Sequence, residues 1–323
     1  MRRDSSVCSR NRRRGCEPRS TVGNNRRQGL GEDIEGQGKR IMNFVEGILQ
    51  FVMQLPPFLA VLQRVLHMVE DPKTSAQDVM EVIQYDQAIT ANVLMMANSA
   101  YFGLRRPVHS IREALVKIGF NELIEIILTR GSAHIFCQAC QGYNLTEGQL
   151  WRHSVACALL SKIHSSRAKW ESTPAQFTAS LLHDVGKIIL SQFVKDHFED
   201  IENLVREQNR SFTEAEKEVL GIDHAELGGK ISERWNFPAD ITAGIRYHHT
   251  PFLTREYHEL VATVHLGDIT ARMAGLGGTI DGSSYDGHKE VMKQYGLTKK
   301  DIEEIINQLE SELKHVDLIL NTK

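Results

Sequence analysis

The sequence predicts an all-α fold, and three observations lead to this prediction. From Met42 onward, apolar residues recur at spacings of three and four, which is the period of an amphipathic helix. No stretch shows the sustained alternation of apolar and polar residues that marks a half-buried strand. Ser, Thr or Asp stands ahead of several apolar runs, where a helix N-cap is expected. Because 41% of the 323 residues are apolar, the chain can bury a substantial core in one large or two modest domains.

Residues 1–41 differ from the rest of the chain, because they are rich in Arg, Gly, Ser and Asn and poor in apolar side chains. Such a segment buries too little apolar surface to offset the entropy of ordering, so a disordered basic extension is expected. A basic arm that binds nucleic acid or a membrane is one interpretation. We favour the two others, which are an unstructured extension without that role and a true translation start at Met42.

Residues 42–143 are predicted to form an N-terminal helical half. Ser110-x-x-Glu113 has the spacing of a capping box and opens a short helix that ends at Gly119. The helices of this half are expected at residues 59–69, 86–101, 110–119 and 121–140.

Residues 144–275 are predicted to form a second helical half. Thr213-x-x-Glu216 is interpreted as another capping box, and Asp223 is expected to cap the helix that runs to Trp235. The remaining helices of this half are expected at residues 146–165, 174–194 (as one helix or two), 238–249 and 256–274.

Residues 276–323 are predicted to form a loop and a last helix. The segment 275–288 is rich in Gly, Ser and Asp, and Thr298 is expected to cap the helix that follows it. An apolar stripe on this helix is interpreted as a core-packing face rather than a dimer seam. The stripe consists of Ile302, Ile305, Ile306, Leu309, Leu313 and Val316.

The overall composition narrows the possible functions. A net charge of −3 and a pI near 6.5 give no sign of a nucleic-acid binder. There is neither an apolar run long enough to span a membrane nor a cleavable leader, so a cytoplasmic protein is expected. Five cysteines, an odd number, indicate a reducing compartment rather than a disulfide framework. Cys137-x-x-Cys140 lacks a second ligand pair and is interpreted as two buried small side chains.

The placement of the histidines indicates a metal site. His183 and Asp184 are adjacent and follow an apolar helical run, which is an unusual place for two polar residues. Adjacent helix positions lie about 100° apart, but a long imidazole and a short carboxylate can still converge on one ion. Gly186 is expected to permit a tight turn and a close approach by a ligand. Asp268 also lies among apolar residues, where a carboxylate is costly without a partner or a metal.

The order of these residues resembles the HD superfamily, a group of helical proteins that includes many metal-dependent phosphohydrolases. The H…HD-x-G-K…D pattern of that superfamily matches His153, His183, Asp184, Gly186, Lys187 and Asp268. Three further histidines complete the set seen in the branch that includes the HD-GYP cyclic-di-GMP phosphodiesterases. They are His224, His248 and His249. The Gly-Tyr-Pro motif expected after His249 is absent, and residues 281–287 echo it only faintly and on the wrong side of Asp268.

A nearer resemblance is to the HDOD group (HD-related output domain) of bacterial signalling proteins, and it covers residues 45–275. The upstream half of the chain carries much of it. The matching segments are Leu55-Pro56-Pro57, Ile83 to Phe102, Ser110 to Leu115, Ile118-Gly119, Trp235 to Pro238 and His248 to Pro251. The resemblance implies a multi-helix HD-superfamily bundle, a bacterial source and a role in signal transduction.

The resemblance implies a divalent transition metal at the histidines. A mixed set of His and Asp suits Fe, Mn, Ni or Zn, and two ions are expected. The first ion is assigned to His153, His183, Asp184 and Asp268. Asp184 is expected to bridge to a second ion, which His224, His248 and His249 would hold. In an enzyme, Asp184 and Lys187 would be the catalytic residues, with Lys187 balancing the charge of a phosphate.

Two functions stay open at this point. The missing Gly-Tyr-Pro loop favours a signalling output module that acts mainly through a partner protein. The complete ligand set favours a metal-dependent phosphohydrolase or phosphodiesterase acting on a nucleotide or cyclic dinucleotide. No receiver or sensor domain is recognisable, so the input signal is expected to come from another protein or from the N-terminal half.

Overall fold

The computed structural model describes residues 64–69, 73–83, 87–98, 102–277 and 295–320, together with Gly47, Asp71 and residues 292–293. Every regular element in these ranges is helical, so the all-α prediction is confirmed. The expectations for residues 1–41 and for most of the loop 275–288 lie outside the described residues. All described elements belong to one compact unit, Val45–Lys323. None of the described helices is both long and apolar enough to cross a membrane.

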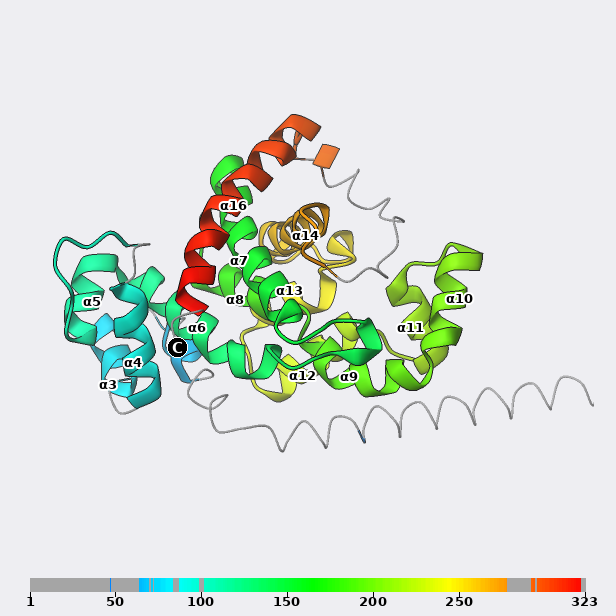
Figure 1. The fold of residues 1–323 in the computed structure, drawn as a ribbon, viewed down its shortest axis with the longest axis horizontal. Helices are drawn as coiled ribbons and strands as arrows, with labels where there is room; N and C mark the ends of the chain where they lie inside the picture. The colour runs from blue at the N-terminus through cyan, green and yellow to red at the C-terminus, as the bar shows by residue number, and fades with distance from the viewer. Residues whose placement is uncertain are drawn as a thin grey trace, which may run out of the picture. The chain divides into compact units, whose positions relative to one another are not determined.

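The helices follow one another closely along the chain (Figure 1). The first are α3 (Ala76–Ile83), α4 (Gln87–Ala97), α5 (Ile111–Ile118) and α6 (Phe120–Phe136). The next are η1 (Gln141–Tyr143), α7 (Gln149–Ala168), α8 (Pro174–Leu182), α9 (Val185–Asp196), α10 (Phe198–Gln208) and α11 (Phe212–Leu220). The last are α12 (His224–Arg234), α13 (Ala239–Tyr247), η2 (Pro251–Leu253), α14 (His258–Met273) and α16 (Lys299–Leu320).

Two helix starts form as the sequence predicts. Ser110 caps α5 by accepting a hydrogen bond from the backbone N–H of Glu113, and the helix ends before Gly119, whose φ is +94°. Asp223 caps α12 by accepting from the backbone N–H of Glu226 at 2.7 Å. In both cases a side-chain oxygen satisfies an N–H group that has no partner within the helix.

The second predicted capping box is wrong. Ser211 and Glu214, not Thr213 and Glu216, form the reciprocal pair that opens α11. Both pairs have the same spacing, so the position at which the backbone becomes helical decides which pair caps. Glu216 is therefore free for another role, and it is completely buried.

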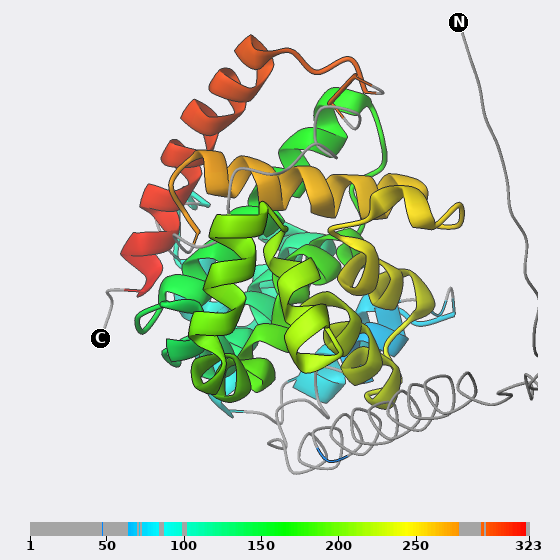
Figure 2. The ribbon, with the colours of Figure 1, turned by 90° about the vertical axis from the view of Figure 1, so that its right-hand side faces the viewer.

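The most extensive helix interface joins α7 and α14 (Figure 2). Gly267 on α14 permits this contact, because a Cβ there would lie 2.7 Å from the carbonyl oxygen of Cys157 on α7. The helix α16 packs against both. Four residues of its apolar stripe are buried in one cluster with α7, which confirms the core-packing interpretation for them. They are Ile302, Ile305, Leu309 and Leu313.

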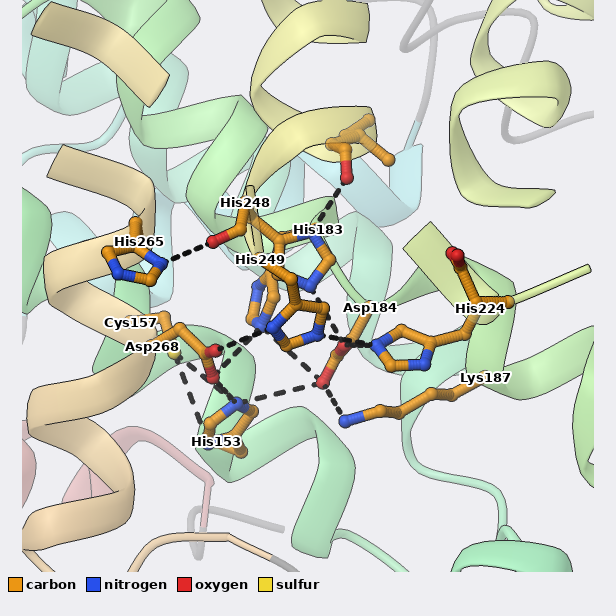
Figure 3. A network of polar contacts seen from close by, with 12 residues as sticks. His153, Cys157, His183, Asp184, Lys187, His224, His248, His249, His265 and Asp268 are labelled. Atoms are coloured by element: carbon orange, nitrogen blue, oxygen red, sulfur yellow. Dashed lines mark hydrogen bonds and ion pairs between the residues drawn. The ribbon is translucent and has the colours of Figure 1, made fainter. Parts of the chain in front are cut away.

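The helices that carry the predicted polar residues pack against one another beside α7. α8 packs against α7, α13 and α14, whereas α12 packs against α9 and α13. α6 contacts α4 and α5 as well as α7 and α8. The predicted polar residues lie where α7, α12, α14, the α8–α9 junction and the end of α13 come together (Figure 3).

Candidate metal centre

The structure brings all seven predicted ligands into one cluster, here called the histidine–aspartate cluster (Figure 3). Distant parts of the sequence supply them, so the cluster depends on tertiary packing. Its members are His153, His183, Asp184, His224, His248, His249 and Asp268.

His153 projects from α7 toward both aspartates. Its Nε2 lies 3.1 Å from Oδ1 of Asp268 and 3.6 Å from Oδ2 of Asp184. Its Nδ1 donates a hydrogen bond to the carbonyl oxygen of Leu276. The ring orientation is therefore fixed by the chain that follows α14.

His183 and Asp184 lie at the junction of two helices, since His183 ends α8 and Asp184 precedes α9. The break in the helix lets both side chains face the same centre despite being adjacent in sequence. His183 Nδ1 donates to the carbonyl oxygen of Ser180 at 2.7 Å. Its Nε2 lies 3.4 Å from Asp184 Oδ2 and 3.7 Å from Asp268 Oδ1.

The other three histidines form a second group beside Asp184. His224 Nε2 lies 3.4 Å from Asp184 Oδ1 and 2.9 Å from His249 Nε2. His248 Nε2 lies 3.8 Å from the same Asp184 oxygen. Asp184 therefore lies between His153 and His183 on one side and His224 and His248 on the other, and its role as a bridging carboxylate stays a prediction.

The donor set fits a divalent metal ion. A carbonyl oxygen can only accept, so the Nδ1 of His153, His183 and His248 carries a proton and the Nε2 faces the cluster, where its lone pair is available to a cation when the ring is neutral. His183 Nε2, His248 Nε2 and Asp184 Oδ1 are buried and make no hydrogen bond within the described residues. Buried polar atoms nearly always have a partner, so three such atoms in one cluster offer donors that a cation could use.

Two cationic side chains balance the negative charges of Asp184 and Asp268. Lys187 Nζ lies 2.9 Å from Asp184 Oδ2, and Arg272 donates to both oxygens of Asp268 at 2.9 and 2.6 Å. Burial alone would raise the pKa of these carboxyl groups. His183 and Lys187 nevertheless hold the pKa of Asp184 well below its usual range, and Arg272 does the same for Asp268.

The two carboxylates also stabilise the protonated, positively charged form of the His183 imidazole. Burial disfavours a charged imidazole, but Asp184 and Asp268 outweigh this effect and raise the pKa of His183 to about 9. Burial and the neighbouring histidines lower the pKa of His248 and His249 well below its usual range. Those two rings therefore stay neutral, which is the form that binds a metal.

Gly186 has a different role from the one expected. A Cβ on Gly186 would lie 1.9 Å from the carbonyl oxygen of His224, so the close approach is made by the backbone of α12 rather than by a ligand. Because of this contact, α12 can bring His224 to the cluster.

Several residues around the cluster were not found by sequence reasoning. Glu216 accepts hydrogen bonds from the backbone N–H of His224 at 3.0 Å and from its ring Nδ1 at 2.7 Å. Arg272 follows Asp268 by one helical turn, and Cys157 follows His153 in the same way, which is a detectable sequence signal. No local pattern connects Glu216 to His224, because they lie on separate helices.

The chain matches the model of the HDOD domain family over residues 55–251. It is 24% identical over 241 residues to an uncharacterized protein from Treponema pallidum (strain Nichols), covering 74% of this chain. The match covers 46% of that relative, so this chain spans about half the length of the curated relative.

Solved structures show the same fold. An HDOD domain protein of unknown function from Geobacter sulfurreducens is 25% identical, with a TM-score of 0.67, covering 88% of this chain and 98% of that chain. A candidate phosphohydrolase from Shewanella amazonensis SB2B is 21% identical, with a TM-score of 0.60, covering 82% of this chain and 93% of that chain. The family match spans more than half of the chain and includes most of the histidine–aspartate cluster, so this chain belongs to the HDOD domain family.

Proposed function

We propose that this chain is a signal-transduction output module that holds one or two divalent transition-metal ions and acts mainly through contact with another signalling protein. The near-complete burial of the proposed ligands carries this proposal. His183, Asp184, His224, His248 and Asp268 are 0% exposed. An ion held there would be shielded from a bulky substrate, which suits a metal that stabilises a conformation.

An exposed apolar surface supports the partner interaction. Phe252, Leu253 and Tyr257 are 50%, 73% and 37% exposed, and they lie just after the double histidine. Leu253 lines the same cavity as His249. Large exposed apolar side chains next to one another are typical of interaction sites. This surface is therefore well placed to sense whether the cluster is ordered by a metal.

The metal part of the proposal is tested by metal analysis of the purified full-length chain. We expect one or two equivalents of transition metal in the wild type and a clear loss in His183→Ala. His109→Ala is the control, because His109 is exposed and distant in sequence from the cluster, and it should keep the wild-type content. Equal metal content in the wild type and His183→Ala would contradict the proposal.

A second candidate function is a metal-dependent phosphohydrolase acting on a nucleotide or cyclic dinucleotide. One observation favours it: His249 lines a cavity of about 550 Å³ whose wall also carries Lys230 and the ion pairs Lys217–Glu226 and Arg246–Glu233. Cationic side chains beside a metal site suit a phosphate group. Lys187 is less suited to contact a substrate, because it is 4% exposed and paired with Asp184.

Hydrolysis assays separate the two functions. The chain is supplied with Mn²⁺ or Fe²⁺ and incubated with cyclic dinucleotides and with a model phosphodiester. Bound metal without turnover is the result that we expect of an output module. Turnover that disappears in Asp184→Asn and persists in His109→Ala would instead establish the phosphohydrolase.

A further inference from the structure

Cys157 lies inside the histidine–aspartate cluster, although the ligand pattern of the sequence does not include it (Figure 3). It follows His153 by four residues on α7, so both side chains project from the same face of the helix. Cys157 is 0% exposed, and its Sγ lies 3.5 Å from His153 Nε2. The close packing of Gly267 against the Cys157 carbonyl holds this part of α7 beside Asp268.

The spacing of four donor atoms suits a tetrahedral ion. One atom each from His153, Cys157, His183 and Asp268 lies within 4.8 Å of the other three. Bond lengths of about 2.3 Å to sulfur and about 2.1 Å to nitrogen or oxygen place tetrahedral ligands about 3.4–3.6 Å apart. The separations along this set are 3.5 Å from sulfur to His153 and 3.1 and 3.7 Å from Asp268 to the two histidines.

One further observation favours a ligand at this position. His183 Nε2 is buried without a hydrogen bond and belongs to the same set of four donors. A bound divalent ion would supply the positive charge that stabilises a thiolate, and the thiol proton would leave to solvent.

We propose that Cys157 is a thiolate ligand of the ion held by His153, His183 and Asp268. This inference rests on the proposed metal site. With sulfur completing the set, Asp184 is available to the second histidine group, since its Oδ1 lies 3.4 Å from His224 Nε2. A thiolate selects Zn²⁺, Fe²⁺ or Co²⁺ over the hard ions Mg²⁺ and Mn²⁺.

The test uses cobalt as a spectroscopic probe. The full-length chain is loaded with Co²⁺ without oxygen, and its absorption spectrum is recorded. We expect a sulfur-to-cobalt charge-transfer band in the near ultraviolet in the wild type and its loss in Cys157→Ala and Cys157→Ser. Cys140→Ala is the matched control, because Cys140 is also a buried thiol but belongs to none of the potential ligand groups. It should keep the band.

The outcomes distinguish this inference from the proposed metal site. Visible cobalt bands without a charge-transfer band in the wild type would overturn sulfur ligation while leaving the metal site standing. A chain that retains no cobalt at all would refute both. A charge-transfer band that survives in Cys157→Ala would assign the sulfur to another cysteine.

An independent measurement does not depend on the folding of a variant. X-ray absorption of the zinc-loaded wild type should show one sulfur neighbour at about 2.3 Å from the ion. A shell of nitrogen and oxygen alone would overturn the proposal. Zinc affinity should also fall by about tenfold or more in Cys157→Ser, at least as much as when a supporting residue of a metal site is removed.

Discussion

At the scale of single residues, the histidines of the cluster are oriented by groups that lie outside it. Glu216 bonds His224 twice, through the backbone and the ring, and its other oxygen accepts a hydrogen bond from the hydroxyl of Tyr143. The carbonyl oxygens of Ser180 and Ile245 fix His183 and His248 in the same way. Such partners hold each ring in the tautomer that exposes Nε2 to an ion.

Replacement of Glu216 by alanine tests this support. The change leaves two buried donors of His224 without an acceptor, so we expect the free energy of unfolding to fall by about 3 kcal/mol. Metal affinity should fall by about 10- to 100-fold, because His224 loses its fixed orientation. Urea unfolding and metal titration would measure the two effects.

Glu214→Ala is the control for this prediction. Glu214 lies in the first turn of the same helix, where it completes the capping box in an exposed position. Its loss should cost about 1 kcal/mol and leave metal affinity unchanged. Equal metal affinity in the Glu214 and Glu216 variants would contradict a supporting role for Glu216.

At the scale of helices, the cluster depends on how closely α9 and α12 approach each other. Gly186 is buried and faces the His224 carbonyl at a distance that leaves no room for a side chain. A larger residue must push α12 away, and protein interiors transmit such a displacement because they are close-packed. The first residue of α12 is His224 itself, so any shift moves a proposed ligand.

The Gly186→Ala variant should therefore lose stability and metal together. We expect a fall in the free energy of unfolding of about 1–3 kcal/mol or more, as for other overpacked sites. Calorimetry and metal analysis would measure it. Gln192→Ala on the exposed side of the same helix should change neither quantity. A Gly186 variant with normal metal content would show that α12 can shift without disturbing the site.

At the scale of the whole molecule, the cluster joins segments that are far apart in the sequence. α7, α12, α14, the α8–α9 junction and the end of α13 all contribute a proposed ligand. An ion bound there would act as a cross-link between helices, in addition to the pairs formed by Lys187 and Arg272. Metal binding and the stability of the folded unit should therefore be coupled.

Removal of the metal with a chelator should lower the melting temperature. At a metal concentration 100 times the dissociation constant, binding stabilises the folded state by about 2.7 kcal/mol. For a chain of this size, that corresponds to roughly 4–5 °C in a thermal scan. The shift should vanish in Asp184→Asn and persist in Asp200→Asn, an exposed control. A shift of the same size in both variants would place the stabilising ion elsewhere.

The helical class follows from the apolar spacing along the chain, whereas the seven converging residues follow from the resemblance of their order to the HD superfamily pattern. Sequence-based prediction fails where equal patterns compete or where contacts are not local. Ser211 with Glu214 and Thr213 with Glu216 have the same spacing, and only the actual start of α11 decides between them. The partnership of Glu216 with His224 and the depth at which Cys157 is buried are set by packing between helices, which periodicity does not encode.

The separation of His153 and Asp268 along the chain has a consequence for biosynthesis. The two residues touch in the folded structure but are 115 positions apart. At about 5–20 residues per second, the ribosome needs roughly 6–23 seconds to add Asp268 after His153. During that interval the nascent chain presents histidines and a thiol without the carboxylate that completes the set. On the proposed metal site, the complete ligand set exists only after α14 has emerged, so an ion bound earlier would be held by an incomplete set.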